Sequence, residues 1–121
     1  MQTAIFPRIN GKYKCVLFTD ILYISANRNY SDIFTLRGQK ITICSNLGVV
    51  ESKLPDKLFS RVHRSYIISL QKIEEFDHNS ILVAGREIPI SKPYFDQLTK
   101  SLITFCSENE GKLREGMANF L

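Results

Sequence analysis

Short runs of β-favouring residues, separated by turn residues, fill the chain from residue 13 to residue 90. Valine, isoleucine, tyrosine, phenylalanine and threonine recur in these runs, as they do in strands. The segments Arg37-Gly38-Gln39, His78-Asn79 and Ala84-Gly85-Arg86 predict tight reversals, so successive strands should pair antiparallel. The expected strands lie within 13–18, 21–25, 30–36, 40–45, 65–70, 72–77, 80–84 and 87–91. This pattern predicts a mainly β domain.

Helical spacing interrupts the strand pattern at residues 45–55 and again after Ser91. Asn46 is a favourable N-cap for a short helix that Pro55 would end. Ser91 could cap a longer C-terminal helix that begins Lys92-Pro93, where a proline in the first turn loses no intrahelical bond. The apolar residues at helical spacing are Leu47, Val50 and Leu54 in the first helix, and Phe95, Leu98, Leu102 and Phe105 in the second.

The composition is that of a soluble domain with one core: 121 residues, 44% hydrophobic and 23% charged. Cys15, Cys44 and Cys106 are odd in number, widely spaced and set among apolar neighbours, so we interpret them as buried thiols. His63 and His78 lack the spacing of metal ligands. We therefore expect no metal and no cofactor. No apolar run approaches the roughly 18 residues of a membrane span, and we expect a cytoplasmic protein that does not bind membranes.

Positive charge is concentrated ahead of a short tail. The net charge is +4, and residues 1–107 contain 14 lysines and arginines against nine acidic residues. Such an excess permits a polyanionic partner without requiring one. The composition shifts at Ser107, where a C-terminal tail (107–121) begins. The tail, with Leu113, Met117 and Phe120 at helical spacing, could fray, pack on the domain or mediate self-association.

The densest polar cluster in an apolar setting lies at residues 58–68. If this segment is extended throughout, Arg61, His63 and Ser65 share one side, and a bend would change that division. Arginine matches phosphate oxygens or the guanine edge, and histidine and serine can hydrogen-bond phosphate. The alternative is a solvated edge strand whose charges prevent aggregation.

The same cluster lacks the residues that a catalytic serine usually requires. A serine nucleophile needs a base within hydrogen-bond reach and a group that orients the base. On one face of a strand the Cα atoms of His63 and Ser65 would be about 7 Å apart, and no acidic residue lies alongside in the sequence. Motifs such as Gly-x-Ser-x-Gly are absent. We expect no enzymatic activity and no small-molecule substrate.

Several motifs agree in order with one known family. They are Asp20-Ile21-Leu22-Tyr23-Ile24, Asn29-Tyr30, residues 47–54 with Leu58-Phe59, Arg61-Val62-His63-Arg64-Ser65-Tyr66-Ile67-Ile68, Ile88-Pro89-Ile90-Ser91-Lys92, and Tyr94. Across about residues 12–103 the chain resembles the LytTR domain, a DNA-binding module of bacterial transcription regulators. The resemblance therefore divides the chain ahead of the tail into an N-terminal lead (1–11) and a DNA-binding domain (12–106). Each piece is weak alone, but their common order is specific.

The resemblance implies an elongated antiparallel β-sheet domain whose loops and strand ends enter successive major grooves of double-stranded DNA. Carried over by position, the base-reading places are Asn29 and Tyr30 in the 27–31 loop, Arg64, and Ser91 with Lys92. The residues expected to flank them at the DNA backbone are Asn46, Gly48, Arg61, His63 and Ser65. For Asn46 the alternative is simple helix capping, and for Tyr30 a half-buried strand position.

The resemblance also implies transcription regulation, either by this chain alone or as the effector domain of a longer protein. Many members of the family have a phosphoacceptor receiver domain ahead of the DNA-binding part, and here about a dozen residues precede the match. Homodimers on repeated half-sites remain an open expectation. The alternative function is a protein-interaction module that uses exposed strand edges or the C-terminal tail.

Overall fold

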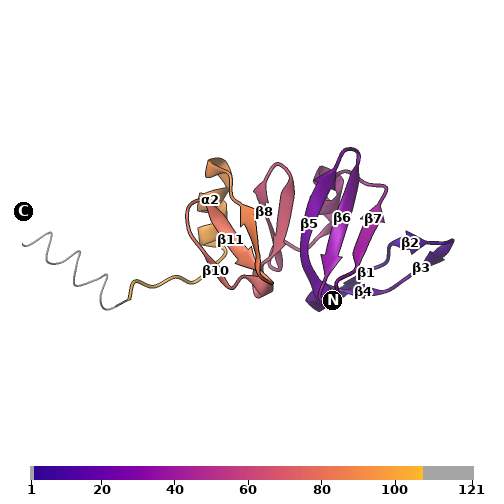
Figure 1. The fold of residues 1–121 in the computed structure, drawn as a ribbon, viewed down its shortest axis with the longest axis horizontal. Coiled ribbons are helices and arrows are strands. Elements are labelled where there is room, and N and C mark those ends of the chain that lie inside the picture. The colour runs from indigo at the N-terminus through magenta and orange to yellow at the C-terminus, as the bar shows by residue number, and fades with distance from the viewer. Residues whose placement is uncertain (1, 108–121) are drawn as a thin grey trace, which may run out of the picture.

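A five-stranded antiparallel sheet forms the centre of the computed structural model, which describes residues 2–107 (Figure 1). Its strand order is β7-β6-β5-β9-β8. The strands are β5 (Ile21–Asn27), β6 (Tyr30–Thr35), β7 (Lys40–Ile43), β8 (Phe59–His63) and β9 (Tyr66–Ser69). The consecutive strands β5, β6 and β7 pair antiparallel as expected. The second hairpin, formed by β8 and β9 and paired with β5 through β9, was not among the expected elements.

Smaller elements extend the molecule at both ends of its long axis (Figure 1). A ribbon of short strands projects beyond β7, and a three-stranded sheet with a helix lies at the end near β8. The ribbon contains β1 (Ala4–Ile5), β2 (Arg8–Ile9), β3 (Lys12–Tyr13) and β4 (Val16–Leu17). The other elements are η1 (Phe18–Asp20), α1 (Leu47–Lys53), η2 (Leu70–Lys72), β10 (Glu75–Phe76), β11 (Ser80–Val83), β12 (Arg86–Pro89) and α2 (Lys92–Lys100). The described part is thus mainly β with a short and a longer helix, as the sequence predicts.

The central sheet separates two hydrophobic cores, so the expectation of a single core is wrong. Neighbouring residues Ile67 and Ile68 of β9 point into different cores, as alternation along a strand requires. The first core lies between the sheet and α1, and the second joins the sheet to β11, β12 and α2. A register shift between Ile21 and Tyr23 sends these residues to opposite cores, although a regular strand would place them on one face.

Turn chemistry explains the register of the hairpins. Ala84 and Gly85, between β11 and β12, both have positive φ, at 49° and 77°, which is the pattern of a type I′ turn. Gly38, between β6 and β7, has φ 77°. Before β11, the Asp77 carboxylate accepts the backbone N–H of Asn79, and this bond helps to lower the pKa of Asp77. All the reversals expected from the sequence are present.

The helices match the prediction at three of their four ends. The Asn46 side chain accepts the Val49 N–H at 2.9 Å and caps α1, which ends at Lys53 shortly before Pro55. Helix α2 begins at Lys92 as expected but ends at Lys100, so the prediction that it continues to Phe105 is wrong. Leu98 is fully buried against the second core, whereas the Phe105 side chain is 90% exposed. The helical spacing of apolar residues extends to Phe105, but this residue has no core to pack against, and a helix is stabilised mainly by the packing of its apolar face.

The interpretation of the cysteines as buried thiols is also wrong. Cys15, Cys44 and Cys106 are all exposed. Cys15 lies in the ribbon, Cys44 directly follows the edge strand β7, and Cys106 follows α2. Apolar neighbours in sequence do not bury a side chain where the adjacent face is uncovered. The expected role of residues 108–121, including Leu113, Met117 and Phe120, lies outside the described residues.

Candidate nucleic-acid interface

Three segments that are distant in sequence lie along one edge of the molecule, at the top of Figure 1. They are the β5–β6 turn with the first residue of β6 (residues 28–30), the β8–β9 turn (residues 64–65) and the start of α2 (residues 91–92). We call these residues the turn row. The row contains all the residues that the resemblance assigns to base reading.

Backbone hydrogen bonds hold the three segments of the turn row together. The Ala26 N–H, at the end of β5, donates to the Ser65 carbonyl at 2.8 Å. The Ser91 N–H donates to the Val62 carbonyl of β8, also at 2.8 Å. The β8–β9 turn is therefore linked on one side to the β5–β6 turn and on the other to the start of α2. The row is part of the folded framework.

The β5–β6 turn presents a basic residue in a strained conformation. Asn27 pairs with Tyr30, so residues 28–29 form a two-residue turn, and Arg28 at its first position has φ 57°. Below the turn, buried Asp32 accepts hydrogen bonds from the Asn27 side chain at 3.2 Å and from Thr42 at 2.6 Å. Arg28 is exposed and was missed as a candidate. A basic residue between two asparagines in a predicted turn was the signal that could have identified it.

Asn29 and Tyr30 complete this segment. Both are exposed, and Tyr30, the first residue of β6, is 47% accessible, so its alternative interpretation as a half-buried strand residue stays open. Neighbouring Ser31 is fully buried and donates to the Ser45 carbonyl at 2.7 Å. This bond ties the start of β6 to the loop that leads into α1.

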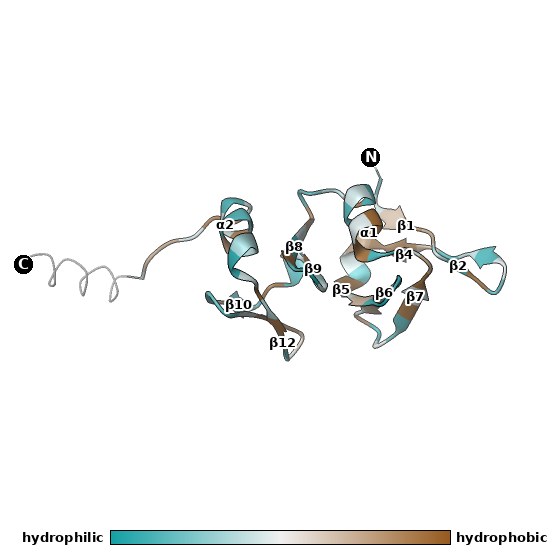
Figure 2. Cartoon of the chain, turned by 90° about the horizontal axis from the view of Figure 1, so that it is seen from above, coloured by the Kyte–Doolittle hydropathy of each residue, from teal (hydrophilic) through white to brown (hydrophobic). Residues whose placement is uncertain are grey.

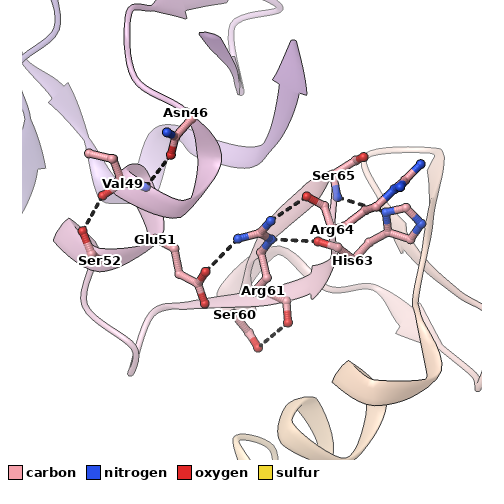
Figure 3. A network of polar contacts seen from close by, with 9 residues as sticks. All are labelled: Asn46, Val49, Glu51, Ser52, Ser60, Arg61, His63, Arg64 and Ser65. Carbon is pink, nitrogen blue, oxygen red and sulfur yellow. Dashed lines mark hydrogen bonds and ion pairs between the residues drawn. The ribbon is translucent and has the colours of Figure 1, made fainter. Parts of the chain in front are cut away.

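Arg61 organises the β8–β9 turn from inside (Figure 3). Its guanidinium donates to the carbonyl of His63 at 2.8 Å and to the carbonyl of Arg64, and it forms an ion pair with Glu51 of α1 at 2.8 Å. The Arg61 side chain is only 14% accessible. Its donors are thus largely used within the protein, and it connects the turn to α1.

The turn itself places different groups at the surface. The chain bends at Arg64 and Ser65 instead of continuing as a strand, so the alternation expected for an extended segment stops at His63. The Ser65 N–H donates to His63 Nδ1 at 3.0 Å, which leaves His63 Nε2 as the ring donor. Figure 3 shows the Arg64 side chain pointing away from the Arg61 network. Arg64 is exposed, with its forked donors available.

Ser91 occupies the N-cap of α2, but its side chain makes no capping hydrogen bond. The reason is local: Pro93 has no N–H to offer, and the Tyr94 N–H donates to the Ser91 backbone carbonyl at 2.9 Å. The Ser91 hydroxyl is therefore not used by the helix. Lys92 is exposed at the first helical position, where the helix dipole disfavours a cation. Helix stability does not account for a lysine here.

Asn46 and Gly48 lie at the start of α1. The Asn46 carboxamide oxygen is used for capping, and Gly48 is exposed in the first turn. The expected contact of these two residues with a phosphate stays a prediction. For Asn46, the alternative role as a helix cap is present in the structure.

Charge in the turn row is not neutralised. Within residues 2–107 the ion pair between Arg61 and Glu51 is the only one found. Arg28, Arg64 and Lys92 have no acidic partner in this part of the chain, and all of them are exposed. The row thus combines unpaired cations with a fixed backbone, which suits a polyanion.

Other site types have weaker support in residues 2–107. No group of at least three histidine, cysteine or acidic side chains is arranged to hold a metal ion there. No helix of the described chain is long and apolar enough to cross a membrane. Burial raises the pKa of Tyr23, whose ring stacks on Phe34 with centroids 4.6 Å apart. A hollow of about 1150 Å³ lies between the N-terminal ribbon and α1, away from the turn row.

Comparisons with known proteins identify the family of this chain. A family profile for the LytTr DNA-binding domain matches residues 11–103. The sensory transduction protein LytT of Bacillus subtilis is 34% identical over 89 residues, which are 69% of this chain and 36% of LytT. The sensory transduction protein LytR of Staphylococcus epidermidis is 31% identical over 78 residues, 64% of this chain and 31% of LytR. The chain thus spans about a third of the length of these relatives.

A solved structure shows the same fold. The LytTr DNA-binding domain of a response regulator from Bacillus cereus superimposes with a TM-score of 0.70 at 22% identity. The match covers 86% of this chain and all of that domain. Together with the profile match over most of the sequence, these findings lead to one conclusion: the chain belongs to the LytTR family of DNA-binding domains.

Proposed function

We propose that this protein binds double-stranded DNA sequence-specifically through the turn row, as a transcription regulator or as the effector domain of one. The observation that carries the proposal is the set of unpaired cations, Arg28, Arg64 and Lys92, on backbone segments joined by hydrogen bonds along one edge. DNA-binding families use such cations to neutralise phosphates and to reach base edges.

The residues of the row have different roles in this proposal. Arg64 projects from a tight turn, and its planar fork matches the O6/N7 edge of guanine in the major groove. Lys92 and Arg28 provide charge on either side of it, each from a separate element. The hydroxyl of Ser91 and the Nε2 donor of His63 supply neutral hydrogen bonds to bases or phosphates. The role is one of binding, without catalysis.

Arg61 acts from beneath the row. Its donors are occupied by the turn carbonyls and Glu51, so we propose that it positions Arg64 and Ser65 and does not itself contact DNA. Asn46 is assigned to the same supporting group, because capping uses its side-chain oxygen.

The test is a duplex titration at several salt concentrations. If about six phosphates are contacted, a plot of the logarithm of affinity against the logarithm of salt concentration should have a slope of about −5. Arg64→Ala should lower affinity for the preferred sequence by roughly 1–3 kcal/mol and relax specificity at one position. Arg37→Ala is the matched control, since Arg37 is exposed in the β6–β7 turn at the opposite edge of the sheet.

A selection from random duplex DNA provides the preferred sequence and the spacing of any repeats. Repeated motifs with a stoichiometry of two would support a homodimer on DNA, and a single motif would argue against it. Failure of the wild-type chain to bind any duplex at low salt would contradict the proposed function. Salt-insensitive association with a protein partner in its place would favour an interaction module.

A further inference from the structure

The N-terminal ribbon, residues 4–17, carries positive charge that neither the fold nor the turn row uses. Residues 1–19 contain Arg8, Lys12 and Lys14 and no aspartate or glutamate. All of these basic residues are exposed, and none has an ion-pair partner among residues 2–107. The ribbon is therefore a purely cationic projection.

The ribbon is well defined from base to tip. At the base, β1 pairs with β4, and Val16 and Pro7 are buried. Toward the tip, the Lys14 N–H donates to the Pro7 carbonyl at 3.0 Å, and β2 pairs with β3. Asn10 and Gly11 form the turn with φ 52° and 78°, the favoured Asn-Gly form of a type I′ turn. A short turn of this kind holds the side chains of β2 and β3 in a constant arrangement.

The tip contributes little to the core. Lys12 and Tyr13 of β3 are exposed, and the Tyr13 side chain is 69% accessible. Directly across the ribbon, the Arg8 guanidinium lies over the Tyr13 ring at 5.9 Å from its centroid. This cation–π contact supports an extended Arg8 side chain without neutralising its charge. Packing does not explain why the tip is basic.

The position of the ribbon relates it to the turn row. The row runs along the long axis of the molecule, and the ribbon projects from one end along the same axis (Figures 1 and 2). In Figure 1 the ribbon leaves the body below the level of the row. A duplex that follows the row reaches the ribbon if it bends toward that end. Arg8 also lies outside residues 11–103, so the family match does not include it.

We propose that the tip of the N-terminal ribbon binds the phosphate backbone of the same duplex, beyond the end of the turn row, and favours a bend of the DNA toward it. The inference rests on the proposed function and extends the protein's footprint on DNA. Its recognition is electrostatic: Arg8, Lys12 and Lys14 neutralise phosphates and read no bases. The cost of bending is offset by these added contacts.

The experiment compares two duplexes that share the sequence selected by the wild-type chain. The short duplex ends at the selected motif, and the long one has about one helical turn added on each side, or roughly 10 base pairs. Fluorophores at the ends of the long duplex report bending. The variant is Arg8→Gln/Lys12→Gln/Lys14→Gln in the full chain, and circular dichroism verifies its fold.

The matched control is Arg37→Gln/Lys40→Gln/Arg86→Gln. It removes the same number of positive charges from exposed positions. Arg37 and Lys40 flank the β6–β7 turn, and Arg86 begins β12 at the end far from Ser91. A general effect of net charge would therefore be the same in both variants.

We expect the ribbon variant to bind the short duplex like the wild type and the long duplex about tenfold more weakly. The magnitude of its salt slope on the long duplex should be smaller by about 2 to 3, because three phosphate contacts are lost and each contributes about 0.9. The fluorophore distance should indicate a straighter duplex, and the preferred sequence should not change. The control variant should resemble the wild type in all of these measurements.

Two results would overturn the inference. Wild-type affinity of the ribbon variant for the long duplex would show that the ribbon does not contact the duplex. An equal loss on both duplexes, or an equal loss in the control, would show a general charge effect. Both differ from failure of the proposed function, in which the wild-type chain itself binds neither duplex.

Discussion

At the scale of single residues, the backbone at Arg28 is the clearest sign of a functional constraint. A side chain other than glycine at φ 57° costs about 1–2 kcal/mol per residue. The first position of such a two-residue turn usually belongs to glycine. Strain of this kind persists where the surrounding structure imposes it and often marks functional sites. The strained residue here is also an unpaired cation of the turn row.

We therefore expect Arg28→Gly to have opposite effects on folding and on binding. Relief of strain, less the greater chain entropy of glycine, should raise the free energy of unfolding by about 0.5–1 kcal/mol. Duplex affinity should fall, because a phosphate contact is lost. Chemical denaturation and a duplex titration measure the two effects. A variant that is more stable and binds DNA normally would remove Arg28 from the interface.

Arg61 provides a test that separates positioning from contact. Arg61→Lys keeps the charge but loses the fork that donates to two turn carbonyls and Glu51. We expect a loss of about 1–3 kcal/mol in unfolding free energy and weaker binding, with an unchanged salt slope. Glu51→Gln is the control: this pair is partly exposed, so its effect should be below about 1 kcal/mol. A reduced salt slope for Arg61→Lys would instead indicate a phosphate contact.

At the scale of elements, the hairpins follow their turn residues closely. The ribbon turn has the favoured Asn10-Gly11 pair, whereas the β11–β12 turn has Ala84-Gly85 in the same left-handed pattern. Asparagine tolerates positive φ better than alanine does. The end of β12 leads directly to Ser91, so this hairpin supports one end of the turn row. Its stability therefore bears on the site.

The element-scale prediction is that Ala84→Asn stabilises the protein. Replacing alanine at φ 49° should raise the free energy of unfolding by about 0.5–1 kcal/mol, while the backbone N–H of residue 84 keeps its bond to Glu74. Gly85→Ala is the opposite control. A Cβ there would meet no atom within 4 Å, so its destabilisation would come from φ +77° alone. Thermal or chemical denaturation measures the change in unfolding free energy for both variants. Changes of the same sign in the two variants would refute the turn assignment.

At the scale of the whole molecule, the turn row exists only because the central sheet brings together segments that are far apart in sequence. The bonds from Ala26 to Ser65 and from Ser91 to Val62 cross between these segments. Both connect to strands that are well packed, since Val62 is fully buried and the second core lies next to it. The segments of the proposed site are therefore held together in the free protein, and an arrangement formed in advance reduces the entropy cost of binding.

This preformed arrangement predicts slow amide exchange at Ala26 and Ser91 in the free protein. Their N–H groups should exchange only through large-scale unfolding, whereas amides at the exposed tip of the β5–β6 turn should exchange rapidly. Hydrogen exchange followed by NMR, with and without duplex DNA, makes the comparison. Rapid exchange at Ala26 and Ser91 that slows only when DNA is added would show that the row forms on binding.

The strands β5 to β7 and β9 to β12, the three expected reversals and the start of both helices were predictable from the sequence, because alternation, turn chemistry and capping depend on neighbouring residues. The strands β1, β2 and β8 were not among the expected ones, although Asn10-Gly11 is a favoured hairpin turn. The sequence also determined the family, through motifs in a common order. Burial depended on tertiary structure, which left the cysteines exposed and ended α2 at Lys100. The resemblance assigned base reading to Arg64 and a backbone contact to Arg61, but it did not show how the two side chains are held. The tertiary structure holds Arg61 beneath the turn, bonded to the turn carbonyls and to Glu51, and leaves Arg64 exposed, because the fold brings α1 against the end of β8.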